Sequence, residues 1–360
     1  MKFNTKIQHL KNLYIFFIFL SLNIFFFSTD KCEAKAFNVD NINISRPFEI
    51  NFNKNEVIDD GFVKAYQNLI KLILNSTDQR RIQQIRLNEI KGMVESFSIK
   101  EEKFINEIYY VNLGVSFNKK KIFRFLEKNN IFPSIPSKKR IFFIPVLIDE
   151  EKKQLLIFSE NKIFEQWNDD IKDFHLINYV LPTEDLEDLN LIRNKFEFIE
   201  EYDFKEIIDK YNLNDSIIAL IFKGKNETRV LSKMNIQKNV TIKNQSFVDL
   251  DINNDLQIKK MVNQLKKIYE DYWKDSNQIN TSIKLSINVK INNDDNLKII
   301  NFEKKMIETD LIYDFFIKKF DKDFTYYQII FNGTPSVFLK TMNENNYEFD
   351  TQNSIWLLKW

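Results

Sequence analysis

The chain has 360 residues, with 52 Lys and Arg against 51 Asp and Glu, and it contains only five Gly, two His and one Cys. This near-neutral charge argues against a nucleic-acid partner, because proteins that bind phosphate backbones concentrate positive charge on one face. The isolated glycines form neither a GxxxxGK nor a GxGxxG motif, which disfavours the usual nucleotide-binding scaffolds.

Residues 1–36 have the pattern of a cleavable secretory signal peptide. A basic start at Lys2, Lys6 and Lys11 precedes an apolar stretch over residues 13–27, and small residues follow at Ala34 and Ala36. We therefore predict export, with cleavage after Ala36 and Phe37 as the first mature residue. The apolar stretch is shorter than the roughly 20 residues of a spanning helix, and no later segment is long enough. An uncleaved segment that anchors the chain in the inner membrane is the alternative, and it would be the chain's only contact with a membrane.

Cleavage at this point would remove Cys32 and His9, so the mature chain would keep only His175. Cys/His zinc sites, cysteine nucleophiles and sites with two histidines are then excluded. A single histidine within the predicted strand 174–181 is more often a structural residue than a catalytic base. We predict no catalytic, cofactor-binding or metal-binding residues, and hence no enzyme.

The first domain is predicted over residues 37–134 in the order β-α-α-β-β-α. An extended stretch over 37–52 precedes a helix whose apolar residues, among them Ile58, Phe62 and Leu69, share one face. A second helix is expected near 83–93. A hairpin with a charged turn at Lys100–Lys103 and a helix capped by Asn118 complete the domain.

The second domain is predicted over residues 138–278, after a hinge at Pro133 and Pro136. The apolar run 141–148 is typical of a strand buried on both faces. Strands alternate with helices up to residue 222 and predict a mixed or parallel α/β sheet, which antiparallel strands extend over 228–252. An amphipathic helix follows, with Ile258, Met261 and Leu265 inside and Lys259, Lys260, Lys266 and Lys267 outside; packing against its own sheet is favoured over a membrane or partner surface.

The third domain is predicted over residues 281–360, in the order β-α-β-β-α-β of a ferredoxin-like, split β-α-β fold. The whole chain is therefore expected to belong to the α+β or α/β class. It would consist of several small modules, with antiparallel and mixed sheets and with helices on one face.

Several of these segments resemble the proteobacterial family described as domain of unknown function 2066. They are Tyr110-x-x-Leu113-x-Val115-x-Phe117, Arg140–Pro145, Trp167, and Leu181-Pro182 with Asp185 and Asp188, over roughly residues 37–275. That family has no established activity. The resemblance implies a Gram-negative periplasmic setting and no particular chemistry.

Three residues are weak ligand-site candidates. Asp185 and Asp188 follow Pro182-Thr183, where paired carboxylates could bind calcium or divide acid and base roles on a glycosidic bond. The favoured interpretation is that these acids lie in the first turn of a helix capped by Thr183, where they complement the helix dipole. Trp167 is expected to anchor the core more often than to stack on a sugar or peptide.

These observations favour a non-enzymatic binding or assembly protein of the cell envelope, whose protein partner the sequence does not identify. A carboxylate-dependent hydrolase that uses Asp185 or Asp188 would bring two or more of the acids Asp185, Asp188, Glu184 and Asp169 together in one cleft. A membrane-tethered subunit is the third alternative. A binding protein would instead expose an apolar patch or an unpaired strand edge.

Overall fold

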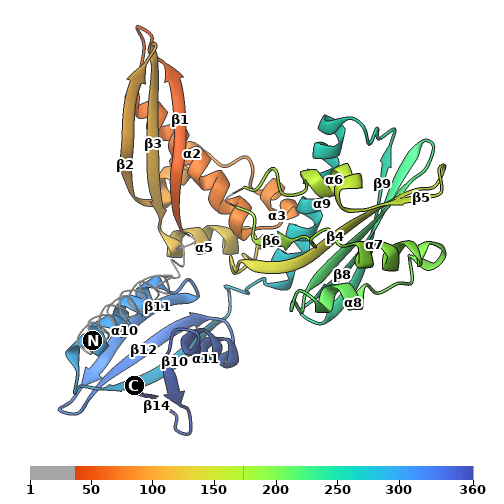
Figure 1. The fold of residues 1–360 in the computed structure, drawn as a ribbon. Helices are drawn as coiled ribbons and strands as arrows, with labels where there is room; N and C mark the ends of the chain where they lie inside the picture. Colours follow the sequence, from red (N-terminus) through yellow and green to blue (C-terminus); the bar gives the residue numbers. More distant parts are fainter. Residues whose placement is uncertain (1–36, 173, 360) are drawn as a thin grey trace, which may run out of the picture. The chain divides into compact units, whose positions relative to one another are not determined.

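A computed structural model describes residues 37–172 and 174–359, and the predicted signal peptide and its cleavage site before Phe37 lie outside them. The fold is mixed α/β with three separate sheets, as the sequence predicts (Figure 1). None of the helices in the described part of the chain is long and apolar enough to cross a membrane.

The N-terminal sheet has three antiparallel strands with β3 in the centre. In sheet order they are β1 (Asn38–Pro47), β3 (Ile108–Phe117) and β2 (Val94–Ile105). The long helix α2 (Lys54–Ile73) covers one face, because Phe62, Leu69 and neighbouring apolar residues recur on one side of it. This leaves β1 and β2 as the two edges of the sheet.

Two local predictions for this region were wrong. The hairpin does not turn at Lys100–Lys103: β2 continues to Ile105, and the turn lies at Asn106 and Glu107, which both have a positive φ. Two-residue hairpin loops require this left-handed backbone, which Asn adopts readily and Glu does not, so the sequence signal was weak. The helix expected near residues 83–93 is α4 (Leu87–Met93), but the predicted order of elements misses a further short helix before it, α3 (Ser76–Arg81).

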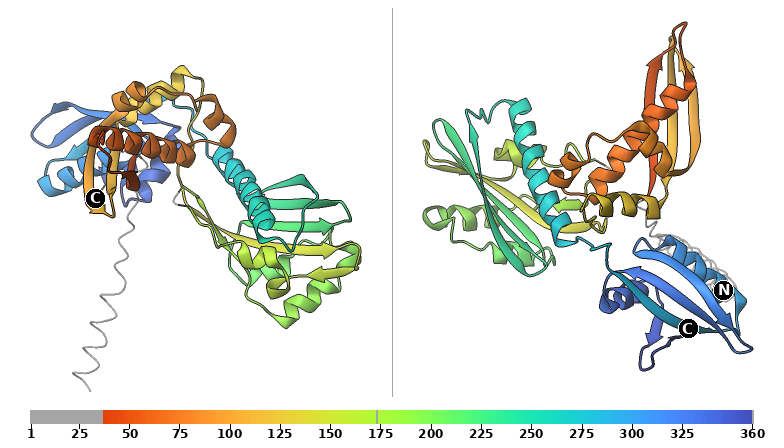
Figure 2. Two further views of the ribbon diagram at one scale, coloured as in Figure 1. Left: turned by 90° about the horizontal axis from the view of Figure 1, so that it is seen from above. Right: turned by 180° about the vertical axis from the view of Figure 1, so that it is seen from behind.

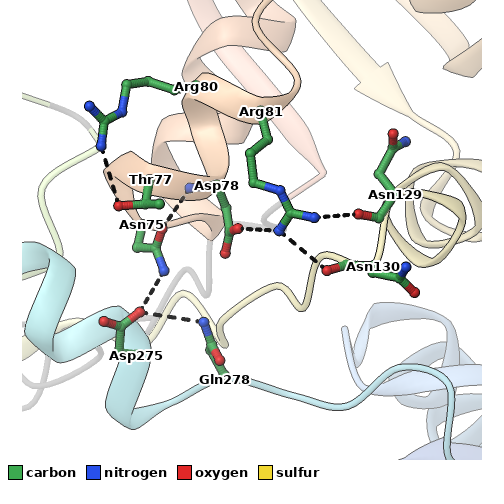
Figure 3. Close-up of polar contacts among 9 residues, drawn as sticks. All are labelled: Asn75, Thr77, Asp78, Arg80, Arg81, Asn129, Asn130, Asp275 and Gln278. Atoms are coloured by element: carbon green, nitrogen blue, oxygen red, sulfur yellow. Dashed lines mark hydrogen bonds and ion pairs between the residues drawn. The ribbon is translucent and has the colours of Figure 1, made fainter.

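The helix α5 (Lys119–Lys128) begins where the sequence predicts. Asn118 is its N-cap, and its side chain accepts a hydrogen bond from the backbone N–H of Lys121. The neighbouring helix α3 makes polar contacts with the end of α5 and with α9 (Asp255–Ser276) (Figure 3). Arg81 donates to the carbonyl of Asn129 at 2.7 Å, and the amide of Asn75 donates to Asp275 at 2.6 Å.

The central sheet is mixed, with a parallel part followed by an antiparallel extension. Its strands are β4 (Lys139–Asp149), β5 (Gln154–Leu156), β6 (Ile177–Val180), β7 (Ser216–Lys223), β8 (Glu227–Ile236) and β9 (Asn239–Val248). Their order is β5-β4-β7-β8-β9, and β6 also pairs with β4. β4 runs parallel to β6 and β7, while β7, β8 and β9 are antiparallel, as the sequence predicts.

Helices cover both faces of this sheet, because β4 is apolar on both sides. Ile141 and Phe143 point to the face of α6 (Lys162–Gln166) and α9, whereas Phe142 and Ile144 point to the face of α7 (Leu186–Arg193) and α8 (Lys205–Asp209). α9 packs on β7 and β8 (Figure 2).

The C-terminal sheet follows the ferredoxin-like order, with one variation. Its elements are β10 (Lys284–Asn292), α10 (Asn296–Glu308), β11 (Ile312–Phe320), β12 (Phe324–Asn332), α11 (Pro335–Asn343), β13 (Glu348–Asp350) and β14 (Trp356–Lys359). The sheet order is β11-β12-β10-β14-β13. A single closing strand was expected, but the chain ends in a short hairpin of β13 and β14. β14 runs parallel to β10, and β13 forms the edge of the sheet. The domain boundaries drawn from the sequence stay predictions.

Candidate binding edge and aromatic hollow

The two acids that the sequence suggested as ligands have structural roles: Asp185 caps a helix and Asp188 forms an ion pair. Asp185, not the expected Thr183, is the N-cap of α7, and it accepts a hydrogen bond from the N–H of Glu187 at 2.8 Å. Asp188 is only 2% exposed, and its carboxylate accepts a hydrogen bond of 2.6 Å from Lys210 of the segment after α8. The same ammonium lies 3.6 Å from Asp185.

Of the four acids of the hydrolase alternative, the structure places Asp185 and Asp188 around one ammonium group, that of Lys210, and gives Glu184 and Asp169 other partners. Asp188 lies on α7, which packs on one face of the central sheet. Asp169 follows Trp167 and interacts electrostatically with Lys266 of α9, on the opposite face. Glu184 accepts a hydrogen bond from Ser159 at 3.0 Å.

Trp167 lies within the core of the central sheet. It is 0% exposed, and its ring stacks on Phe143 with the ring centroids 3.8 Å apart, while Tyr179 meets it edge-on. Its indole N–H is buried without a hydrogen-bond partner among the described residues. A side chain enclosed in this way cannot stack on a sugar or peptide unless the core opens.

A row of buried charges on α9 was missed in the sequence. Lys266, expected outside, is buried, as are Glu270 and Lys274 one and two turns further along. Each finds a backbone partner: Glu270 accepts hydrogen bonds from the N–H groups of Leu176 and Ile177, and Lys274 donates to the carbonyl of Lys71. Burial raises the pKa of Glu270 and lowers that of Lys274. Charged residues of this kind look like solvent-facing residues in the sequence, because the backbone groups that bind them belong to distant segments.

His175 lies beside this row and precedes β6 instead of lying within it. Burial, followed by the charges of Lys266 and Lys274, lowers its pKa to about 4. The ring is therefore neutral at pH 7, and its Nδ1 accepts a hydrogen bond from the N–H of Lys172. Within residues 37–172 and 174–359 no group of three or more His, Cys, Asp or Glu side chains is placed to hold a metal ion.

An exposed aromatic cluster lies at the end of the β2–β3 hairpin. Phe48 and Phe52, from the loop between β1 and α2, meet Phe104 of β2 and Tyr109 of β3, with ring centroids 4.8 to 5.0 Å apart. The loop is held there because the N–H of Phe48 donates to the carbonyl of Glu107 at 2.7 Å. Phe48 and Phe104 are each more than half exposed, so the cluster has an open side.

These rings border a hollow of about 480 Å³, which we call the aromatic hollow. Its lining consists of Phe48, Phe52, Lys54, Glu102, Lys103, Phe104 and Tyr109. Lys54 donates hydrogen bonds of 2.8 and 2.9 Å to the two oxygens of Glu102, which lowers the pKa of that carboxyl. Burial, and then the Glu102 carboxylate, raises the pKa of Tyr109. The hollow thus has apolar walls and a neutralised charge pair.

A second hollow, of about 270 Å³, borders the same part of β2 and includes Ile105, Tyr110 and Asn112. The register shows which side of the sheet it occupies: Phe104 is paired with Tyr109 on the α2 side, whereas Lys103 is paired with Tyr110 on the other side. Lys103 lines both hollows. The two hollows therefore lie on opposite faces of the sheet, and the second extends from β2 across β3 to Asn43 and Ile44 of β1.

The edge itself is regular at this point. The pairing of β2 with β3 is irregular between Ile99 and Glu101, but from Glu101 to Ile105 it is continuous. The sequence predicted an exposed edge or patch in general terms, but it did not locate this one. The four aromatic residues come from three segments, and their meeting depends on where the hairpin turns.

A comparison with protein-family models finds no match for this chain, and a comparison with the curated proteins finds none either. The resemblance to the family described as domain of unknown function 2066 therefore stays a prediction.

Proposed function

We propose that this chain is a non-enzymatic binding protein of the cell envelope that captures an extended, apolar segment of a partner protein at the β2 edge. The segment adds as a further strand beside Glu101–Ile105. Backbone hydrogen bonds to the free edge supply affinity, and side chains of the segment supply specificity.

The free outer edge of β2, with a hollow lined in part by β2 on each face of the sheet, carries this proposal. Side chains of an added strand point alternately to the two faces of a sheet. One set would enter the aromatic hollow, and the other would lie against Lys103 and Ile105 on the β2 side of the second hollow.

The chemistry of the site favours an apolar partner without a strong charge. Four aromatic rings form the walls of the aromatic hollow, and the basic residues around it already have acidic partners. Lys54 pairs with Glu102, Lys103 with Glu101 at 2.5 Å, and Lys100 of the same strand with Asp40 at 2.6 Å.

The proposed location rests on the signal-peptide pattern of residues 1–36, which supports export to the periplasm. The tethered alternative places the same site on a chain that stays in the inner membrane. The hydrolase alternative has less support, because the two acids that converge, Asp185 and Asp188, serve as a helix cap and as the buried partner of Lys210.

The test is a photo-crosslinking experiment in cells that express the chain. A benzoylphenylalanine placed at Ile105 should yield an adduct whose partner segment is mapped by mass spectrometry. A synthetic peptide of that segment should bind the purified chain, and Phe104→Asp should weaken its binding about tenfold or more, since burial of a Phe side chain contributes about 1.5–3 kcal/mol.

Phe198→Asp is the matched control, because Phe198 is exposed but belongs to a short helical turn in the central part of the chain. Equal binding by the Phe104→Asp and Phe198→Asp variants would contradict the proposal. So would the absence of an adduct at Ile105.

A further inference from the structure

The outermost strands of the three sheets differ in how well they are protected against pairing. Natural edge strands are short, or they carry bulges, prolines and charges that block a further strand. β5 and β13 have only three residues, β1 has an irregular register and ends at Pro47, and β2 and β11 each have two irregularities.

β9 has only one of these devices, a single charged side chain. It is ten residues long, contains no proline, and pairs with β8 in an unbroken register from Asn239 to Val248. Its only charged residue, Lys243, belongs to the α9 side, where it interacts electrostatically with Asp275.

The other side of β9 is apolar and uncovered. Val240, Ile242 and Val248 alternate along it and are 72%, 56% and 74% exposed. They share the face on which α7 and α8 lie, since Asn244 of the same set is paired with Leu231. A long, regular edge with exposed apolar residues is the kind that pairs with another strand.

We propose that a second copy of this chain occupies that edge, with the two β9 strands antiparallel about a two-fold axis centred on Asn244. In this register residues 240–248 pair throughout. Val240 of each copy faces Val248 of the other, and Ile242 faces Ser246. This association is independent of the partner site proposed at β2.

Charge selects this register over its neighbour. Centring the axis on Lys243 would pair equally many residues but would oppose the two Lys243 ammonium groups, and like charges directly opposite each other are destabilising. Centring it on Asn244 places Lys243 opposite Gln245. Centring it on Gln245 would shorten the paired segment to 242–248 and leave Val240 without its partner.

The width of the resulting sheet is acceptable. Each central sheet is five strands across, because β5 and β6 pair with the same side of β4. Two such sheets give ten strands, at the upper end of about ten for twisted open sheets.

Cysteine crosslinking tests the register. In a Cys32→Ser background, which removes the only cysteine, Asn244→Cys should form a disulfide-linked dimer on oxidation. Directly opposed residues in antiparallel strands lie about 4.5–5.5 Å apart, within disulfide reach. Ser246→Cys is the control, because two residues 246 would lie about 13 Å apart along the strands.

Light scattering tests the association itself. The purified chain should have twice the chain mass, Ile242→Lys should reduce it to a monomer, and Ile317→Lys, an equally exposed change on β11, should leave the dimer intact. Circular dichroism checks that each variant is folded. The proposal would be overturned if the parent chain were a monomer or if the Ile242→Lys variant were still a dimer. Equal crosslinking at positions 244 and 246 would also overturn it. So would the finding that the β9 edge of a monomer binds a different protein.

Discussion

Replacement of Trp167 separates a core anchor from a ligand-stacking residue. The side chain is 0% exposed and packs between Phe143 and Tyr179, so Trp167→Ala leaves a large cavity. Substitutions of this kind destabilise by about 3–5 kcal/mol, and complete burial places Trp167 in the upper part of that range.

Trp167→Phe should destabilise the chain much less, by about 1–2 kcal/mol. It keeps the stacking on Phe143 and loses one ring, and it also removes an indole N–H that has no partner among the described residues. An unsatisfied buried donor costs about 1–3 kcal/mol, so its removal offsets part of the lost packing.

Urea unfolding followed by far-ultraviolet circular dichroism measures both variants, because tryptophan fluorescence would change with the substitution itself. The parent chain and Trp356→Phe serve as references. A loss below about 1 kcal/mol for Trp167→Ala would refute the reasoning, since it would mean that the ring contributes little to the core.

Three further predictions concern residues that the fold buries or strains. Burial raises the pKa of Glu270 above its ordinary value of 4.5, so the stability that its protonated form contributes is present below about pH 4.5 and is lost as the pH rises. The urea midpoint of Glu270→Gln should therefore rise relative to that of the parent chain between acid and neutral pH. A difference between the two midpoints that does not change with pH would contradict this. Lys210→Met removes the partner of the buried Asp188 and should lower the melting temperature, whereas Lys205→Met on the exposed side of α8 should not. Glu107 has a φ of 59°, a left-handed backbone conformation that costs residues other than glycine about 1–2 kcal/mol. Glu107→Gly should therefore raise the free energy of unfolding by roughly 0.5–1 kcal/mol. An unchanged or lower melting temperature would argue against strain at this turn.

The elements with strong periodicity were predictable from the sequence. The apolar run of β4 was recognised as a strand buried on both faces, and the spacing of Ile258, Met261 and Leu265 identified the buried side of α9. Asn118 was also recognised as a helix cap, because capping is local: it depends on a side chain and a backbone group only three residues apart.

The features that failed depend on distant residues. The hairpin turn was misplaced because Glu107 is a poor match for a left-handed position. Lys266 was placed outside because its polar partner, the carbonyl of Asp170, belongs to another segment. The identity of the edge strands could not be derived, since an edge is defined by which strands do not pair.

The binding edge at β2 also depends on residues that are distant in the sequence. Its hollows need Phe48 and Phe52 from one loop, Phe104 from the strand and Tyr109 from its neighbour. Each is unremarkable in sequence, because a chain with 35 Phe residues offers no local reason to single out three of them.

Hydrogen–deuterium exchange of the purified chain, with and without the crosslink-derived peptide, tests the central claim most directly. Strand addition at β2 gives the free edge groups of residues 101–105 hydrogen-bond partners, so exchange in this segment should slow when the peptide binds. Exchange in β9 should not respond to the peptide. Protection confined to another part of the chain, or binding without any protection of residues 101–105, would contradict the account.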